Sequence, residues 1–465
     1  MSIEQLVAQL AQIVGLTNVL VDPADMLPFS KGARGEQGKA AFVVCPATTR
    51  EVASVVRLLR ALDIGFVVQG ANTGLVAGSV PDMTGEQGVV SLRRLTGDII
   101  VDPLNRSCTV GAGVRLSALN EVLAGYDCCF PIDLGSDPSI GGMIATNTGG
   151  ARFIRYGDVR DHVLGLEVVL LDRDGTVLDL MNALRKNNVG LETVQLFIGT
   201  AGRYGIVTKA VLDVSRRPGE VAAAIVVPRD DAAVTEILLA VEGRFGNELA
   251  AFEGMSRNAL ACALKHVPNV RNPFAPGDIP PYALLIEVSR PGGAANGISL
   301  DAQLQEYLGG LLERDDPPVS DAFFGSPHEL WALRHALHSG LLASGRVMAF
   351  DLAFQRGRVL EFRNDVRALM ERVHPHLVLC DFGHIGDGGI HCNFLEPWHA
   401  ETTLSVEQIA DLRSMVMERA VRGHRGSFSG EHSIGRANVA FYDRFVDLNS
   451  RRIADGIDAV IRDLT

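Results

Sequence analysis

The chain has 465 residues, of which 47% are hydrophobic and 21% are charged, and its formal net charge is −12. This length predicts two or three domains with sizeable cores, and the composition excludes a disordered or fibrous protein. The acidic balance argues against a nucleic-acid partner or an anionic membrane surface, because a basic face normally binds these partners. No apolar run reaches the ~18–20 residues that a membrane-spanning helix needs.

The cysteines and the N-terminus indicate the cellular compartment. The seven cysteines form no CxxC pattern, which predicts reduced thiols and no iron–sulfur cluster. The first residues read MSIEQLVAQLAQIVGL, with Glu4 among apolar residues at helical spacing. They predict a surface helix rather than a signal peptide. We therefore expect a cytoplasmic protein without a membrane span.

The first predicted elements are a strand, a helix and a second strand. AFVVCP (41–46) is a short apolar strand, and the helix that follows begins with Thr48 and Glu51 at capping-box spacing,. The second strand, IGFVVQG (64–70), runs into the glycine-rich loop GANTGLVAGSVP (70–81). Successive backbone amides in such a loop can bind phosphate oxygens, although its spacing is neither that of Rossmann nor that of Walker loops. A glycine-rich turn without a ligand is the alternative.

Two more glycine-rich segments follow before the middle of the chain. They read FPIDLGSDPSIGGMIATNTGGARFIRYG (130–157) and FIGTAGRYGIVT (197–208). Several such loops in one α/β region predict an extended ligand whose polar chain lies against the backbone. Residues 216–219, RRPG, then break the pattern and predict a domain boundary. Strands at 223–228 and 282–289 and a helix near 230–242 predict an α+β domain after it.

These segments, in this order, resemble the FAD-linked 2-hydroxy acid dehydrogenases of the vanillyl-alcohol oxidase fold, which include D-lactate and D-2-hydroxyglutarate dehydrogenases. The resemblance extends from about Pro46 to about Arg436. It implies an α+β protein whose residues 1–217 form a PCMH-type FAD-binding domain of two α/β subdomains. Residues 218–410 would form an α+β substrate domain with an antiparallel sheet. Residues 411–465 would form a helical segment that returns to the active site.

The resemblance also implies how FAD is bound. The loop from Gly70 to Gly74 would hold the pyrophosphate, and the segment from Pro131 to Gly150 would line the flavin and ribityl chain. Relatives with covalent FAD carry a histidine in the first loop, where this chain has Ala71, so non-covalent FAD is expected. The third loop, TAGRYG (200–205), keeps the family's glycines but lacks its glutamate. The predicted FAD-binding residues are Gly70, Ala71, Asn72, Thr73, Gly74, Gly78, Ser79, Pro131, Asp133, Gly135, Ser136, Gly141, Gly142, Ala145, Asn147, Gly150, Ile206 and Val207.

The stretch FGHIGDGGIHCNF (382–394) predicts a β-hairpin, because Asp-Gly between alternating apolar residues is a strong hairpin signal,. A two-residue loop at 387–388 would place His384 directly opposite His391, with Asn393 on the same face. Two adjacent imidazoles suit a divalent metal, and a purely structural histidine pair is the alternative. Glu431, beside His432 in SFSGEHSIGR (427–436), offers a third ligand,.

The family's pattern in this region resembles GHxGDGNxH followed by SGEHGIG. It implies that His384, His391 and Glu431 bind the metal, with Zn or Mn as the expected ion. It further implies that Asn393 contacts the substrate or flavin and that His432 is the general base. Gly389 and Ser433 depart from the family's Asn and Gly beside these positions.

The helix HELWALRHALHSGLLASG (328–345) carries Arg334 and His338 on one face, next to a leucine stripe,. A solvated surface arginine is the alternative, but the resemblance implies that Arg334 binds the substrate carboxylate, and we place His338 in the same substrate site. Ala349 stands where relatives acting on two-carboxylate substrates carry a lysine, although Arg346 or His338 can replace that charge. A D-lactate-like acid and a D-2-hydroxyglutarate-like acid are therefore both candidates.

The predicted function is oxidation of a D-2-hydroxy acid to the 2-oxo acid. Arg334 would bind the carboxylate, the metal would lower the pKa of the hydroxyl group, and His432 would accept its proton while hydride passes to flavin N5. Without a nicotinamide fingerprint, reduced flavin needs an external acceptor such as an electron-transfer flavoprotein or a quinone. The alternatives are an FAD oxidase that uses O2 on another alcohol and a catalytically silent FAD- or metal-binding protein. Base rates favour a homodimer.

Overall fold

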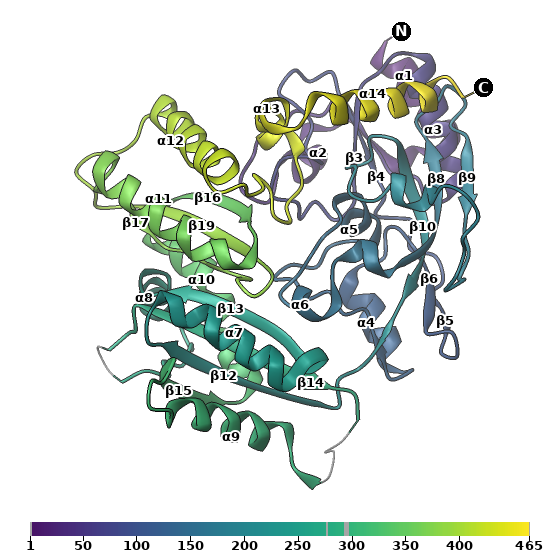
Figure 1. Cartoon of the computed structure of the whole chain (residues 1–465). Coiled ribbons are helices and arrows are strands. Elements are labelled where there is room, and N and C mark those ends of the chain that lie inside the picture. Colours follow the sequence, from purple (N-terminus) through teal and green to yellow (C-terminus); the bar gives the residue numbers. More distant parts are fainter. Residues whose placement is uncertain (1, 276–277, 293–296, 465) are drawn as a thin grey trace. The chain divides into compact units, whose positions relative to one another are not determined.

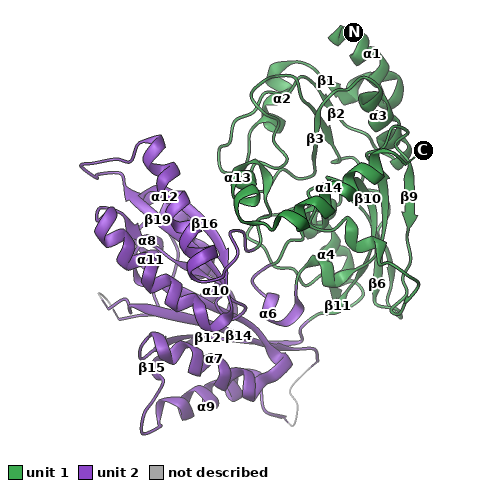
Figure 2. Ribbon diagram, turned by 45° about the horizontal axis from the view of Figure 1, so that its top comes forward, with its two compact units in different colours: residues 1–149, 158–217, 431–465 green, residues 150–157, 218–430 purple. Residues whose placement is uncertain are grey.

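The chain forms two compact units, each built from segments that are separate in the sequence (Figure 2). The computed structural model describes residues 2–275, 278–292 and 297–464. Unit 1 comprises residues 1–149, 158–217 and 431–465, and unit 2 comprises residues 150–157 and 218–430. Unit 2 thus includes a short piece of the second glycine-rich segment, and unit 1 includes the chain from Glu431 onward.

The first sheet of unit 1 is four-stranded, with β2, β4 and β3 parallel and β1 antiparallel at its edge. Figure 1 labels two of its strands, β3 and β4. Its strands in sheet order are β1 (Val19–Leu20), β2 (Val43–Val44), β4 (Gly88–Ser91) and β3 (Phe66–Gln69). The helices of this region are α1 (Ile3–Val14), α2 (Pro23–Ser30) and α3 (Thr49–Ala61). Apolar residues of α1 and α3 share one core with β2 and β4. The predicted strand–helix–strand order of residues 41–70 is confirmed as β2, α3 and β3.

The predicted cap of α3 forms in a modified way. The Thr48 hydroxyl oxygen accepts a hydrogen bond from the Glu51 amide at 3.1 Å. The Glu51 carboxylate accepts from the amide of Ala47, one residue before the cap, at 2.7 Å. Two amides at the start of the helix are therefore satisfied by side chains, which fixes where α3 begins.

The second sheet of unit 1 is five-stranded and antiparallel. Its strands in sheet order are β5 (Ile100–Asp102), β6 (Ser107–Gly111), β10 (Gly205–Asp213), β8 (Val163–Leu170) and β9 (Val177–Leu180). A two-stranded sheet pairs β7 (Cys128–Cys129) with β11 (Ser215–Arg216). The remaining helices of unit 1 are α4 (Leu116–Ala124), α5 (Ile140–Thr146), α13 (Gly435–Phe445) and α14 (Leu448–Arg462). The two sheets contribute to the same core.

Unit 2 is built on one eight-stranded antiparallel sheet. Its strands are β12 (Glu220–Pro228), β13 (Leu249–Ser256), β14 (Tyr282–Arg290), β15 (Val319–Gly325), β16 (Gly345–Ala353), β17 (Val378–Leu379), β18 (Phe382–Gly383) and β19 (Gly389–Pro397). Its helices are α6 (Phe153–Tyr156), α7 (Asp231–Phe245), α8 (Arg257–His266), α9 (Leu300–Leu312), α10 (Pro327–Ser344), α11 (Val359–Val373) and α12 (Val406–Glu418). Apolar residues of α8 and α10 form a core with β12, β13 and β14.

Helix α10 begins with Ser326 as N-cap and Pro327 in its first turn, and its predicted leucine stripe is buried. It crosses α8 closely at Gly340. A Cβ atom on Gly340 would lie 2.5 Å from the Ala263 nitrogen and 2.6 Å from the Ala263 Cα. Backbone cannot move aside as a flexible side chain can, so the close packing of α10 requires glycine at this position. None of the helices in the described residues combines the length and the apolarity needed to cross a bilayer.

We predict that Gly340→Ala destabilises the protein by about 1–3 kcal/mol, because the added methyl overpacks the contact between α10 and α8. The measurement is the Tm of unit 2 in thermal denaturation. Gly310→Ala is the matched control, because Gly310 is also helical and a Cβ atom there meets nothing within 4 Å. A Tm of Gly340→Ala equal to that of the wild type would contradict the packing described here.

Candidate functional site

A cavity of about 280 Å³ in unit 1 opens beside the first glycine-rich loop. Gly70 and Ala71, which follow β3, and Ser139, the N-cap of α5, line it, and the structure thus brings the first and second glycine-rich segments together. The other lining residues are Arg93, Thr96, Gly97, Ile99, Gly113, Val114, Arg115 and Ala118. Two arginines give this cavity positive charge, which suits the phosphates of a dinucleotide.

The close approach of the two loops requires glycine at position 70. A Cβ atom on Gly70 would lie 2.2 Å from the Ser139 hydroxyl oxygen. That oxygen accepts a hydrogen bond from the Gly142 amide at 3.3 Å and so caps α5. A larger side chain at position 70 would therefore push into both the cavity and the helix cap.

Side chains of the first loop fix its shape. Asn72 has a left-handed φ of 58°, its amide nitrogen donates to the Lys31 carbonyl at 2.8 Å, and its oxygen accepts from the Ser79 hydroxyl at 3.0 Å. Gln69 donates to the Ser79 carbonyl at 2.8 Å. The side chains of Asn72 and Ser79 therefore hold the loop closed, which leaves its backbone to face a ligand.

Other predicted FAD-binding residues also have packing roles. Asn147 caps the end of α5 with a φ of 51° and donates to the Asp158 carboxylate at 2.6 Å. Ile206 and Val207 are buried residues of β10 in the core of unit 1. Gly150 belongs to unit 2, apart from the other predicted residues, which lie in unit 1. A direct contact of these residues with FAD stays a prediction.

The arginines of the cavity were missed by the sequence reasoning. Arg93 follows β4 and lies over the ring of Phe29, with its guanidinium carbon 5.0 Å from the ring centroid. Arg115 precedes α4 and donates to the Asp137 carbonyl at 2.5 Å. Both arginines lie outside the glycine-rich segments. Their position at the cavity follows only from how the strands and loops are arranged in the structure.

In unit 2, the turn between β18 and β19 differs from the predicted two-residue hairpin loop. Phe382 pairs with His391, so the predicted pairing of His384 with His391 is wrong by two residues. The carbonyl of His384 accepts from the amides of Asp387 at 3.1 Å and Gly389 at 3.0 Å, which closes a four-residue turn. Gly386 packs against β13, and a Cβ atom on it would lie 2.6 Å from the Phe252 Cβ. This packing against β13 excludes the shorter turn.

The two histidines nevertheless lie together. His384 lies one residue beyond β18, just before the turn, so the strand ladder alone does not set its direction. Its ring nevertheless lies beside that of His391, with the ring centroids 5.3 Å apart at an interplanar angle of 81°. The structure thus brings these two predicted metal ligands together within unit 2.

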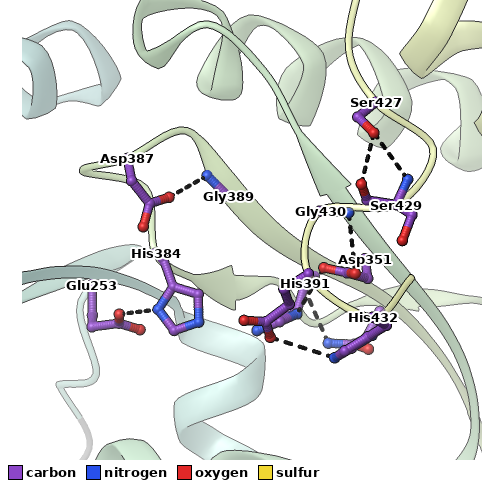
Figure 3. A network of polar contacts seen from close by, with 12 residues as sticks. Glu253, Asp351, His384, Asp387, Gly389, His391, Ser427, Ser429, Gly430 and His432 are labelled. Atoms are coloured by element: carbon purple, nitrogen blue, oxygen red, sulfur yellow. Dashed lines mark hydrogen bonds and ion pairs between the residues drawn. The ribbon is translucent and has the colours of Figure 1, made fainter. Parts of the chain in front are cut away.

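A buried glutamate on β13 contacts two of the predicted site residues. The Glu253 carboxylate accepts from Arg334 Nε at 2.6 Å and forms a very short contact with His384 Nδ1 (Figure 3). Burial would raise the pKa of Glu253, but the positive charge of Arg334 and the contacts that Arg334 and His384 make with the carboxylate hold that pKa at about 2. The sequence signal for this residue is a single charge inside the apolar strand LAAFEGM (249–255).

Asp351 on β16 was also missed. It pairs with His391 across the sheet, with 3.8 Å between His391 Nδ1 and a carboxylate oxygen of Asp351. The other carboxylate oxygen accepts from the Gly430 amide at 3.1 Å. Asp351 therefore adds a carboxylate beside His391, and the register of β16 against β19 is the information that the sequence lacks.

The substrate-side predictions concern Arg334, His338 and Asn393. Arg334 on α10 is buried, with its guanidinium carbon 4.8 Å from the Phe382 ring centroid, and His338 lies one helical turn further. Asn393 is buried opposite Ala349 on β16 and donates to the His391 carbonyl at 3.1 Å. Arg346 is engaged elsewhere, because it donates to the Leu404 carbonyl at 2.7 Å and pairs with Glu396.

Glu431 and His432 open the last segment of unit 1. Their side chains face each other, with 3.4 Å between His432 Nε2 and a Glu431 oxygen. Three residues further, Gly435 begins α13 against the first glycine-rich loop, where a Cβ atom would lie 2.1 Å from the Val76 carbonyl oxygen. Within unit 1, the chain after His432 thus packs on the loop that lines the cavity. The metal and base roles of these two residues stay predictions.

Two family models match the chain. The first, described as an FAD binding domain, matches residues 40–181. The second, described as the C-terminal domain of FAD linked oxidases, matches residues 217–450. The first match contains the cavity-lining loops, and the second contains all of the unit 2 residues described above except residues 150–157.

Curated proteins of the same kind resemble nearly the whole chain. A probable mitochondrial D-2-hydroxyglutarate dehydrogenase of Oryza sativa subsp. indica is 34% identical, over 86% of this chain and 69% of the relative. The mitochondrial D-2-hydroxyglutarate dehydrogenase of Bos taurus is 32% identical, over 90% of this chain and 74% of the relative. The D-2-hydroxyglutarate dehydrogenase of Xanthomonas citri pv. viticola is 30% identical, over 94% of this chain and 90% of the relative.

Solved structures with lower sequence identity share the fold. A 4-ethylphenol oxidase from Gulosibacter chungangensis superposes with a TM-score of 0.71 at 17% identity, covering 99% of this chain and 96% of the other. A p-cresol methylhydroxylase superposes with a TM-score of 0.71 at 15% identity, covering 98% of this chain and 94% of the other. The predicted α+β fold with a PCMH-type FAD-binding domain is confirmed.

We predict that Gly70→Val weakens FAD binding by about tenfold or more, because overpacking between loop and helix cap costs about 1–3 kcal/mol and each 1.4 kcal/mol is tenfold. The measurement is the ratio of FAD to protein after dialysis at micromolar concentration. Gly65→Val serves as the control, because the nearest atom to a Cβ there is 3.7 Å away. Full FAD content in Gly70→Val would show that this loop does not approach the cofactor.

Proposed function

This chain belongs to the family of FAD-linked D-2-hydroxy acid dehydrogenases, and we propose that it oxidises a small D-2-hydroxy acid to the 2-oxo acid with the assistance of a divalent metal. The observation that carries the proposal is the arrangement of Arg334, His384 and His391 in unit 2. One buried carboxylate, that of Glu253, contacts both Arg334 and His384, and the ring of His391 lies beside that of His384.

Arg334 suits the carboxylate of the substrate. Its Nε is occupied by Glu253, and one face of its guanidinium lies over Phe382. Among the described residues, no protein acceptor contacts its two terminal nitrogens. These nitrogens form the planar pair that binds a carboxylate in bidentate fashion. Arg334 would therefore bind and orient the substrate.

The nitrogen and oxygen donors of unit 2 suit Zn or Mn. His384 is held at Nδ1 by Glu253, which leaves Nε2 as its metal-binding nitrogen, and His391 lies beside it next to Asp351,. When bound, FAD supplies the hydride acceptor, and a divalent ion supplies a Lewis acid that lowers the pKa of the substrate hydroxyl. We propose Glu431 as a third ligand and His432 as the base that accepts the hydroxyl proton.

The substrate class includes D-2-hydroxyglutarate and D-lactate. The names of the relatives favour the two-carboxylate acid. Ala349 opposite Asn393 and the engaged Arg346 favour an acid with one carboxylate, because neither supplies a second cation. We propose an external electron acceptor, an electron-transfer flavoprotein or a quinone, because the sequence has no nicotinamide fingerprint.

We predict that a D-2-hydroxy acid, but not its L-enantiomer, bleaches the flavin absorbance of the FAD-loaded protein under anaerobic conditions. A panel should contain both enantiomers of 2-hydroxyglutarate and lactate, with and without a chelator. Removal of the metal should slow bleaching without releasing FAD. Flavin that no member of the panel reduces would support the catalytically silent alternative, and stoichiometric peroxide in air would support the oxidase.

We further predict that His432→Ala slows anaerobic flavin reduction by about 10²–10⁴-fold, the usual effect of losing a general base. FAD content and substrate binding should stay unchanged. His399→Ala is the control, because His399 is an exposed histidine of the same chain. Wild-type reduction rates in His432→Ala would remove His432 from the mechanism.

A further inference from the structure

We propose that Glu253 is a positioning residue that fixes the orientation of both the substrate-binding arginine and a metal-binding histidine. The inference rests on the roles of Arg334 and His384 in the proposed function. Glu253 itself reaches neither solvent nor substrate, because its side chain is 0% exposed.

The place of Glu253 in the sheet is unfavourable for a charge. It lies on β13 on the same face as Ala251 and Met255, and it pairs with Leu285 of β14. All three of these neighbours belong to the apolar core that α8 and α10 cover. An ionised carboxylate persists in such a core only when its partners replace the lost water.

Both oxygens of Glu253 have such a partner, and each partner comes from a different element. One oxygen accepts from Nε of Arg334 on α10 at 2.6 Å, and the other contacts Nδ1 of His384 in the turn after β18. A single carboxylate therefore joins β13, α10 and the four-residue turn.

The contacts with the Glu253 carboxylate have a chemical consequence for both Arg334 and His384. A hydrogen on His384 Nδ1, donated to Glu253, leaves the lone pair on Nε2, which is the tautomer that a metal needs. Occupation of Arg334 Nε leaves the two terminal nitrogens for the substrate carboxylate. Because the same group holds both side chains, loss of its charge should weaken metal binding and substrate binding together.

Unit 2 contains a second buried carboxylate that pairs with none of the predicted site residues and can serve as a control. Glu287 on β14 is also buried, and it pairs with Arg152 Nε at 2.7 Å and with Trp331 Nε1 at 2.6 Å. Its register partner on β13 is Ala251, so it lies on the same face as Glu253, two residues away. Neither of its partners is a predicted site residue, which makes Glu287→Gln the control for a general loss of a buried ion pair.

The test compares Glu253→Gln and Glu287→Gln with the wild type, all as full-length, FAD-loaded protein. Zn²⁺ and Mn²⁺ binding is measured by calorimetry after removal of bound metal, and Tm is measured alongside. We expect metal affinity to fall about 10–100-fold in Glu253→Gln, the usual effect of losing the carboxylate partner of a histidine ligand. KM for the D-2-hydroxy acid should rise as well. Glu287→Gln should lower Tm and leave metal affinity unchanged.

A measurement on the wild type covers the case in which Glu253→Gln fails to fold. Nitrogen NMR of ¹⁵N-histidine-labelled protein, assigned with His384→Gln, reports the tautomer of His384. We expect the proton on Nδ1 and a shift of the Nε2 resonance when Zn²⁺ is added. A proton on Nε2 in the metal-free protein, or unchanged metal affinity in a folded Glu253→Gln, would overturn this inference alone. Wild-type protein that binds neither ion would overturn it together with the proposed metal.

Discussion

The turn between β18 and β19 is the constraint on which the unit 2 site depends. His384 and His391 lie on opposite sides of this four-residue turn, and their ring centroids are 5.3 Å apart. Gly386 holds this turn on β13, because its amide donates to the Phe252 carbonyl at 3.1 Å. The same close approach leaves no room for a side chain at position 386, where a Cβ atom would lie 2.6 Å from the Phe252 Cβ.

Buried ion pairs are a second feature of unit 2. Three carboxylates in or beside its sheet, Glu253, Glu287 and Asp381, are each paired with an arginine through Nε at 2.6–2.7 Å. In other proteins, replacing such buried ion pairs with apolar residues often leaves stability unchanged or increases it. Stability alone therefore does not explain why these pairs are present. Glu253 differs from the other two because its partners, Arg334 and His384, are the side chains that we propose bind the substrate and the metal. The proposed function would therefore explain why this pair is present.

Much of this account could be predicted from the sequence. Glycine-rich loops, helix caps and the leucine stripe of α10 are local patterns, and the structure confirms the elements that they predict. The predicted family and fold are also confirmed, because ordered motifs from Pro46 to Arg436 carry that information. The turn at 385–388 was predicted wrongly, since its length is set by packing against β13 rather than by the Asp-Gly pair. Arg93 and Arg115 at the unit 1 cavity, and Glu253 and Asp351 in unit 2, were missed because long-range strand pairing and helix packing bring them beside the predicted residues of their own unit.

The most direct test of the account is X-ray absorption spectroscopy of the Zn²⁺-loaded, FAD-containing protein. We expect a first shell of nitrogen and oxygen atoms that contains two imidazoles, His384 and His391, and that loses one imidazole in His391→Ala. A shell of oxygen atoms alone, a thiolate ligand from any cysteine, or an unchanged shell in His391→Ala would contradict it.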